Sequence, residues 1–333
     1  LVLFRDDLRT VDHPALLTAS EAGPVVALYI LDEQSPGIRP LGAAARWWLH
    51  HALISLRASL QELGIPLVLR RGNSVHIIEE ITGHGACAAV HWNRRYGQAE
   101  RAVDTSIKDH VRAAGIHAQS HAGALLHEPW ELLTQSGTGY KVFTPFHNAL
   151  RSTEIRQPLP APQPQSPPHV ELPGSDTLAS WELLPSSPDW STGLADAWTP
   201  GEPAAQERLA EVLGDIAQHY GERHDRPDLD GTSALSPALR WGHLSPHQVW
   251  SELSALASST ARLQYFYLHI HTAIAALHCI NAHISRCAIG GHFIGAVLLE
   301  LIQTVQLQYT EVIICPAIAG ATIARQTMIQ LAR

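Results

Sequence analysis

Short apolar runs alternate with helical patterns over the first 120 residues of the chain. Four runs predict buried strands because polar or turn residues bound each of them, and they cover residues 1–4, 25–31, 66–69 and 88–92. Apolar residues spaced three or four apart predict helices over residues 14–22, 42–63, 75–81 and 100–114. Strands that alternate with helices form a parallel sheet covered on both faces, and right-handed crossovers make it doubly wound. The pattern therefore predicts an α/β doubly wound parallel-sheet N-terminal domain over residues 1–127.

The pattern changes after this region. Prolines set among Gln and Ser over residues 158–168 favour extended chain, so we expect residues 128–200 to form an inter-domain linker that runs over a surface. A helical pattern resumes at Gly201 and runs to about Leu213, with Glu202 in its first turn, where a carboxylate suits the helix dipole. A second helical stretch covers residues 215–226. Residues 201–254 are therefore expected to begin a helical domain.

Composition and single residue types add four further limits. The chain has 333 residues, 45% apolar and 16% charged, which suffices for a buried core and argues against disorder. The net charge of −8 means that any nucleic-acid binding must use a local basic face. The four Cys show no close pairing, so we expect a reducing cytoplasm, and no secretory signal is visible. Met328 is the only Met, so we expect a short N-terminal piece to be missing before Leu1.

One turn contains polar groups that could bind a ligand. Thr232, Ser233 and Ser236 place three hydroxyl groups within five residues, directly after Gly231 and ahead of a helical start. Hydroxyl and backbone N–H groups of such a turn can converge on phosphate oxygens. An ordinary helix N-cap uses the same residue types, so the turn alone leaves both interpretations open. No G-x-G-x-x-G follows the first strand, where the sequence is FRDDLR, and this argues against a dehydrogenase.

Five blocks, in order, resemble one family. The run YGERHDRPDLDGTSALSPALRWGHLSP at 220–246 resembles the flavin-binding signature of the DNA photolyase/cryptochrome family. The other blocks are FRDDLR at 4–9 with DHPAL at 12–16, WNRRY at 92–96 with Glu100 and Asp104, YKVFTPF at 140–146, and WTPGE at 198–202. The resemblance covers about residues 1–250. It implies an all-α flavin-binding domain behind the α/β antenna domain.

The resemblance implies a function. Photolyases hold fully reduced FAD, with methenyltetrahydrofolate or a deazaflavin as a second antenna chromophore, and repair cyclobutane pyrimidine dimers in DNA by light-driven electron transfer. The resemblance implies a deoxyribodipyrimidine photo-lyase, a carbon–carbon lyase whose partner is DNA containing pyrimidine dimers. We expect the protein to be a cytoplasmic monomer that does not bind membranes. The alternatives are a cryptochrome-like blue-light photoreceptor and a non-catalytic, degenerate flavoprotein.

The motif match also implies site residues. FAD phosphates would be held through hydroxyl and backbone N–H groups of Thr232, Ser233, Leu235 and Ser236 and through the backbone of Ala234, with Tyr220 near the phosphate and ribitol end. Arg223 and Asp225 are expected to brace the turn. No catalytic residue is assigned, because the family's electron-transfer Trp residues follow residue 250, where this chain has no Trp.

The tail differs from the rest of the chain. Residues 255–333 hold six charged residues and no Asp or Lys, and the family's later motifs are absent from them. We therefore expect a truncated flavin domain, impaired activity and a tail that is frame-shifted or otherwise aberrant; an apolar helical hairpin is the alternative. The segment 287–302 is too short, and too interrupted by His292 and Glu300, for a membrane span. A His/Cys-rich run over residues 269–292 lacks a spacing that closes a zinc site, so no metal is assigned.

For each of three sets of residues, the sequence leaves two roles open. Trp47 and Trp48 are either helix-face aromatics, one of them in the core, or an antenna stacking site. Glu100 either bonds a pigment or is a carboxylate at a helix N-terminus. Arg223, Arg226 and Arg240 either face DNA phosphates or pair with Asp225, Asp228 and Asp230.

Overall fold

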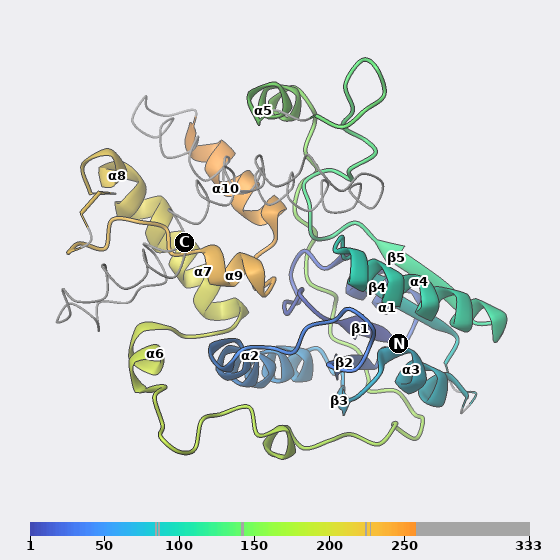
Figure 1. Ribbon diagram of the computed structural model, residues 1–333. Coiled ribbons are helices and arrows are strands. Elements are labelled where there is room, and N and C mark those ends of the chain that lie inside the picture. Colours follow the sequence, from blue (N-terminus) through green and yellow to red (C-terminus); the bar gives the residue numbers. More distant parts are fainter. Residues whose placement is uncertain (84, 86, 141–142, 224, 227, 258–333) are drawn as a thin grey trace, which may run out of the picture.

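The computed structural model describes residues 1–333 except 84, 86, 141–142, 224, 227 and 258–333. Its centre is a parallel sheet with the strand order β3-β2-β1-β4-β5 (Figure 1). The strands are β1 (Val2–Phe4), β2 (Ala27–Leu31), β3 (Leu67–Arg71), β4 (Ala89–Asn93) and β5 (His117–His121). The chain moves outward from β1 to β3 and returns to the centre for β4. The predicted doubly wound α/β fold is confirmed.

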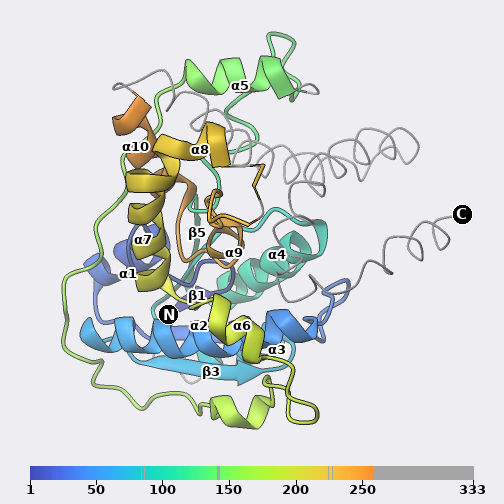
Figure 2. The same ribbon diagram turned by 90° about the vertical axis from the view of Figure 1, so that its left-hand side faces the viewer.

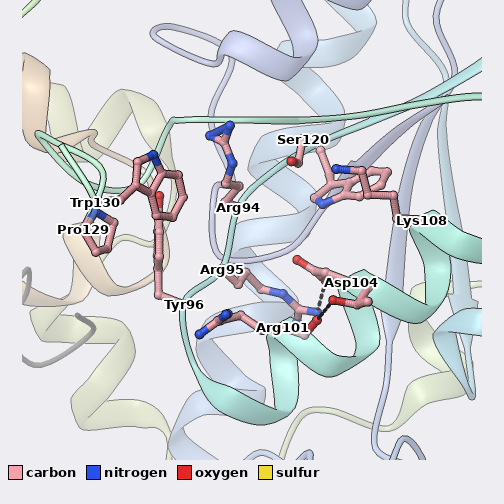
Figure 3. A pocket seen from close by; sticks show the side chains of 11 residues that line it. Arg94, Arg95, Tyr96, Arg101, Asp104, Lys108, Ser120, Pro129 and Trp130 are labelled. Carbon is pink, nitrogen blue, oxygen red and sulfur yellow. Dashed lines mark hydrogen bonds and ion pairs between the residues drawn. The ribbon is translucent and has the colours of Figure 1, made fainter. Parts of the chain in front are cut away.

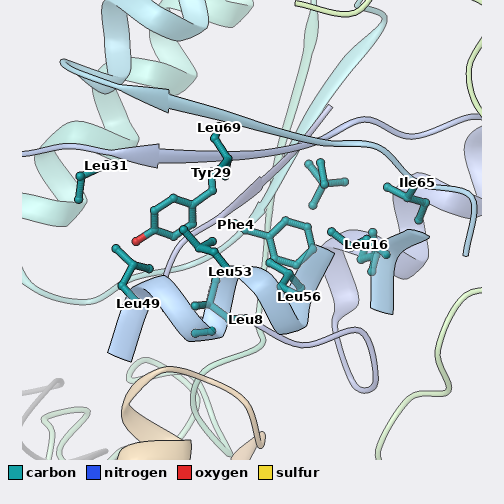
Figure 4. Close-up of a cluster of buried hydrophobic side chains, with 14 of the residues drawn as sticks. Phe4, Leu8, Leu16, Tyr29, Leu31, Leu49, Leu53, Leu56, Ile65 and Leu69 are labelled. Carbon is teal, nitrogen blue, oxygen red and sulfur yellow. The ribbon is translucent and has the colours of Figure 1, made fainter. Parts of the chain in front are cut away.

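Helices cover both faces of this sheet. The helices α1 (Pro14–Ala22) and α2 (Ala43–Glu62) pack on the face that carries Phe4 and Tyr29 (Figure 4). The helices α3 (Ser74–Gly83) and α4 (Gln98–Ala113) pack on the face that carries Leu3 and Trp92. Successive side chains of a strand point to opposite faces, so neighbours such as Leu3 and Phe4 enter different cores. Three layers result.

The edge strand β5 was not predicted. Its sequence, HAQSH, offers Ala118 as its single apolar residue, so hydrophobic periodicity gives no strand signal there. Parallel pairing with β4 defines it, with Ala89 opposite His117 and Asn93 opposite His121. A strand at the edge of a sheet needs only one apolar face, and β5 buries Ala118 against the α3 and α4 side.

Residues 128–200, which we expected to be a linker, also form helices and contribute to the core. They contain α5 (Phe143–Arg151), a 3-10 turn (Leu178–Trp181) and α6 (Thr192–Ala197). The proline-rich part is extended along the α/β surface, where the Leu159 N–H donates to Asp12 Oδ1 (2.9 Å) and the Gln165 N–H to Leu63 O (3.0 Å). Trp181, by contrast, is 2% exposed and completes the core beneath α1 and α2. The domain boundaries at 127 and 200 stay a prediction.

The second unit is helical. It contains α7 (Glu202–Glu211), a π-helical turn (Val212–Ile216), α8 (Ala217–Arg223), α9 (Ser236–Arg240) and α10 (Pro246–Ala257) (Figure 2). The π-helical turn joins the two predicted helices into one continuous run. Leu209, Val212, Leu235, Val249 and Leu253 are among the side chains that form its apolar core.

The two units meet at the carboxyl ends of β1 and β4. In a doubly wound sheet the crevice at this reversal of strand order commonly receives a ligand. Here the loop after β1 contacts the segment between α9 and α10 instead: the Leu8 N–H donates to Trp241 O (3.1 Å) and Arg9 Nη1 to Gly242 O (3.0 Å). The Glu202 carboxylate adds a third contact, because it accepts the Thr10 N–H (2.7 Å).

The remaining sequence expectations concern the tail. The His/Cys-rich run, the segment 287–302 and both interpretations of residues 255–333 lie almost wholly outside the described residues. Within the described part, no helix combines the length and the apolar character needed to cross a bilayer. In that same part, no group of three or more His, Cys, Asp or Glu side chains is arranged to hold a metal ion.

A buried histidine at the junction predicts a pH dependence of stability. His243 is fully buried, accepts the Trp48 Nε1–H at Nε2 (3.0 Å) and lies with Nδ1 3.1 Å from Leu8 O, so both ring nitrogens have partners only in the neutral form. Burial lowers the pKa of His243 to about 4 from its ordinary 6.5. The unfolded chain therefore takes up a proton at higher pH than the folded chain. This contribution to stability is complete above pH 6.5 and is lost as the pH falls towards 4.

When the pH falls from 7 to 5, protonation of His243 in the unfolded chain should by itself lower the free energy of unfolding by about 1–2 kcal/mol. His121 and His247, whose pKa values burial also lowers to about 4, add to the loss. The measurement is urea unfolding at both pH values for the natural chain and for His243→Gln, which cannot ionise. The variant should lose less stability on acidification; equal losses in the two proteins would contradict the assignment.

Candidate functional site

Residues 230–236, here called the hydroxyl turn, lead into α9. A Cβ on Gly231 would lie 2.3 Å from Arg223 O, so only glycine permits this close approach of two backbones. Ala234 has φ +52°, and Leu235, next to it, has φ −83° in the right-handed region. When a residue with left-handed backbone conformation is followed by one with right-handed conformation, successive N–H groups point towards one concave side. The backbone of the turn therefore has the form of an anion cradle.

Polar groups of this turn are available for a ligand. Within the part of the chain that the structure describes, the hydroxyl groups of Thr232, Ser233 and Ser236 have no hydrogen-bond partner in the protein. The same holds for the N–H groups of Ser233 and Ala234. These residues are half-buried, whereas the Leu235 side chain is 2% exposed in the helical core and leaves only its backbone for binding. The donors suit the oxygens of a phosphate group.

The structure brings five of the six expected cofactor residues into this one turn. Tyr220 lies on α8, half-buried, and packs on the same apolar core that holds Leu235. The backbone of Arg223 abuts Gly231, and Arg223 Nη1 donates to Asp215 Oδ2 (2.9 Å). Arg223 therefore contacts the turn through its backbone while its side chain stabilises the end of α8.

The nearby arginines are paired with acids. Arg226 bonds Asp228 at 2.8 and 2.6 Å, and Arg240 Nη1 bonds Asp6 Oδ1 at 2.7 Å. Of the two roles left open by the sequence, the structure favours ion pairing. Arg226 has one of the expected acids, Asp228, as its partner, whereas Arg223 and Arg240 bond Asp215 and Asp6.

A second candidate site lies beside β4, and the sequence did not reveal it. A pocket of about 360 Å³, here called the basic pocket, opens at the carboxyl end of β4 between α4 and the segment 129–130 (Figure 3). Its lining combines cations, aromatic rings and small polar groups, namely Trp92, Arg94, Arg95, Tyr96, Arg101, Asp104, Thr105, Lys108, Ser120, Pro129 and Trp130. Basic and aromatic groups together suit a flat, anionic molecule.

Contacts within the basic pocket hold its walls in place. The Arg94 guanidinium lies 5.7 Å from the centroid of the Trp130 ring and donates to Glu128 Oε1 (3.2 Å). Across the pocket, Arg95 Nη2 donates to Asp104 Oδ1 (2.7 Å). Trp130 itself is 56% exposed, so its ring is accessible to a ligand.

Known proteins share this architecture. The family model for DNA photolyase matches residues 1–165. A deoxyribodipyrimidine photo-lyase of Agrobacterium fabrum is 41% identical over 263 residues, which make up 78% of this chain and 54% of that protein. The chain belongs to the DNA photolyase family. Cryptochrome-1 of Arabidopsis thaliana is 31% identical over 255 residues, or 75% of this chain and 37% of that protein.

A solved structure agrees with the sequence comparisons. The crystal structure of a bacterial class III photolyase from Agrobacterium tumefaciens matches this photolyase-family chain with a TM-score of 0.79 and 36% identity, over 86% of this chain and 58% of that one. The chain spans about half the length, or less, of these relatives.

Two further expectations for this photolyase-family chain can now be compared with the structure. Trp47 is 3% exposed, and Trp48 is half-buried with its indole N–H bonded to His243, so the pair serves as helix-face aromatics of α2. A Cβ built on Gly97 would lie 2.1 Å from a Glu100 carboxylate oxygen, which places that carboxylate over the N-cap of α4. Of the two roles considered for each, the structure favours the structural one.

Proposed function

We propose that the hydroxyl turn holds the phosphates of FAD and that the protein is a flavoprotein of light-driven DNA repair. The observation that carries the proposal is the concave turn whose three hydroxyl groups, together with the N–H groups of Ser233 and Ala234, have no partner in the described protein. Thr232, Ser233 and Ser236 donate through hydroxyl groups, and Ala234 and Leu235 through the backbone. Tyr220 lies towards the ribitol end.

Bound, reduced FAD would supply the electron that splits a cyclobutane pyrimidine dimer, as the family resemblance implies. The residues of this chain contribute binding and orientation: they stabilise phosphate charge through N–H and O–H dipoles and fix the direction in which the cofactor extends. The proposed partner is DNA containing pyrimidine dimers, and the proposed setting is a cytoplasmic monomer.

A visible spectrum of the purified chain, recorded with added FAD, tests the flavin site. Because the family's motifs after residue 250 are missing, we expect weak binding with spectral shifts of the flavin band at high FAD concentration. A stoichiometric flavin band after dialysis would contradict the expected impairment. The absence of any FAD binding would contradict the proposed site.

A repair assay separates the two proposed roles. Irradiated oligothymidine is incubated with the FAD-loaded chain under blue light, and loss of dimers is measured against a dark control. Dimer loss that depends on light supports the photo-lyase. Photoreduction of bound flavin without dimer loss favours the cryptochrome-like photoreceptor, to which 31% identity with Arabidopsis cryptochrome-1 points.

For the second chromophore we propose the basic pocket. Methenyltetrahydrofolate and deazaflavins are flat ring systems, and folates carry carboxylates as well. Trp130 offers an accessible ring face, and Arg101 and Lys108 lie on the α4 wall of the pocket, where they can meet anionic groups. The ligand would therefore stack at one end of the pocket and be charge-neutralised at the other.

We expect Trp130→Ala to weaken binding of methenyltetrahydrofolate by roughly 10-fold, because stacking of an aromatic ring contributes about 1–1.5 kcal/mol. The matched control is Trp190→Ala, which removes another exposed indole, 44% accessible, outside the pocket. Titration followed by the absorbance of the pigment gives the dissociation constants. If both variants bind as the natural chain does, the pocket is not the chromophore site.

A further inference from the structure

We infer that Arg208, on α7, is the positioning residue of the hydroxyl turn: it holds the turn by its carbonyl oxygens and so directs the donors of the turn to the opposite side. This inference rests on the proposed function only where it concerns FAD. The role of Arg208 in shaping the turn stands on contacts within the protein.

The Arg208 guanidinium is fully engaged by the turn and its flank. Its Nε donates to Ser233 O (3.1 Å) and its Nη2 to Thr232 O (2.9 Å). Both Nη atoms also bond the Asp230 carboxylate, each at 2.7 Å, and Nη1 reaches Glu211 Oε2 (3.2 Å). A guanidinium has five N–H donors in a fixed plane, and these five bonds match that number.

Because of the geometry of the peptide bond, these contacts to carbonyl oxygens also fix the direction of the neighbouring N–H groups. In a trans peptide the C=O and the following N–H point to opposite sides of the chain. Because Thr232 O and Ser233 O point at Arg208, the N–H groups of Ser233 and Ala234 point away from it. These are the N–H groups that have no partner in the described protein. Arg208 therefore prepares the cradle without touching its ligand.

The helix that carries Arg208 is itself well anchored. Ala205 and Leu209 of α7 are buried in the helical core, and Glu202, in its first turn, is bonded to the loop after β1. Arg208 thus projects from a fixed element to a turn that has no regular hydrogen-bond pattern of its own. Its bond to Asp230 holds the pKa of that carboxyl below its ordinary range, so the ion pair persists to lower pH than an unpaired aspartate would stay ionised.

Lysine cannot replace arginine here. A lysine ammonium retains the charge for Asp230 but has three donors on a single atom, so it cannot replace the four bonds that Arg208 makes to the carboxylate and the two carbonyl groups. Arg208→Lys therefore keeps the positive charge and removes only the planar arrangement of donors. The matched control is Arg226→Lys. Arg226 also lies close to the turn, but among the described residues its side chain bonds only Asp228, two residues away, on an exposed surface.

Two measurements on the full chain test the inference. Hydrogen–deuterium exchange of the apo protein should become at least 10-fold faster in peptides covering residues 230–236 of Arg208→Lys, with other peptides unchanged and Tm within about 2 °C of the natural chain. FAD titration should give a dissociation constant roughly 10-fold higher for Arg208→Lys. Arg226→Lys should change neither.

The outcomes separate the inference from the proposed function. Unchanged exchange in the turn of Arg208→Lys would overturn the positioning role, whether or not FAD binds. Faster exchange confined to the turn with an unchanged FAD dissociation constant would also overturn it, because the shape of the turn would then not matter for the cofactor. If the natural chain binds no FAD, the proposed function fails while the exchange experiment still decides the role of Arg208 in shaping the turn.

Discussion

Changing Thr232 to Val, Ser233 to Ala and Ser236 to Ala in one variant should weaken FAD binding by roughly 100- to 1,000-fold. A hydrogen bond to a charged group contributes about 1.5–3 kcal/mol. The backbone N–H groups remain in the variant and keep part of the interaction, so we expect a total loss of about 3–4 kcal/mol. Equilibrium dialysis with FAD measures the two dissociation constants directly.

The chain offers a matched control for this experiment. Thr134, Ser136 and Thr138 form a second hydroxyl cluster, in which Thr134 Oγ1 lies 2.9 Å from Thr138 Oγ1. Their replacement by Val, Ala and Val removes the same kinds of atoms away from the hydroxyl turn and should leave FAD binding unchanged. If the two triple variants bind FAD equally well, the hydroxyl turn does not hold the phosphates.

The substitution Gly242→Ala should lower the free energy of unfolding by about 3–5 kcal/mol. Gly242 has φ +65°, and a Cβ there would lie 2.2 Å from Asp6 O and 2.5 Å from Asp7 Cα. Both neighbours are backbone atoms of the loop after β1, so neither can rotate away. The added methyl group would separate the helical unit from the sheet at the junction where Arg9 bonds Gly242 O.

Gly115→Ala is the control that isolates this close approach. Gly115 has a similar φ of +77°, but nothing lies within 4 Å of a Cβ built on it. Its substitution should cost only the backbone strain of a left-handed residue, about 1–2 kcal/mol. Urea unfolding of the natural chain and both variants gives the comparison. Equal losses in the two variants would show that contact with the β1 loop does not matter for stability.

Local signals in the sequence predicted most elements of the fold. The strands β1 to β4 and the helices α1 to α4 were predicted within a few residues, because the side chains that define them recur at the period of a helix or a strand. β5 was missed because the partner strand, and not its own residues, makes it a strand. Trp181 was assigned to a surface connection because the proline-rich stretch 158–168 was extended to the whole segment 128–200, although its ring completes the core.

Some residues of the candidate sites could likewise be recognised from the sequence, and others could not. The hydroxyl turn was recognisable because Gly231, Thr232, Ser233 and Ser236 are close in sequence. Arg208, whose Nε bonds Ser233 O, is 25 residues away from it, and nothing in the helical pattern of α7 distinguishes this arginine from a solvated one. The basic pocket was missed for a similar reason: its walls come from β4, α4 and Trp130, and Trp130 lies in the segment taken as a linker.

The sequence by itself therefore determined the order of β1 to β4 and of α1 to α4 along the chain, the family and the residues of the hydroxyl turn, since each depends on neighbours along the chain. Only the tertiary structure decided what occupies the crevice between β1 and β4. It shows Gly242 and its flanking residues there, against the backbone of Asp6. Such a contact depends on the shapes of two surfaces that form separately, and residue types alone do not encode that fit.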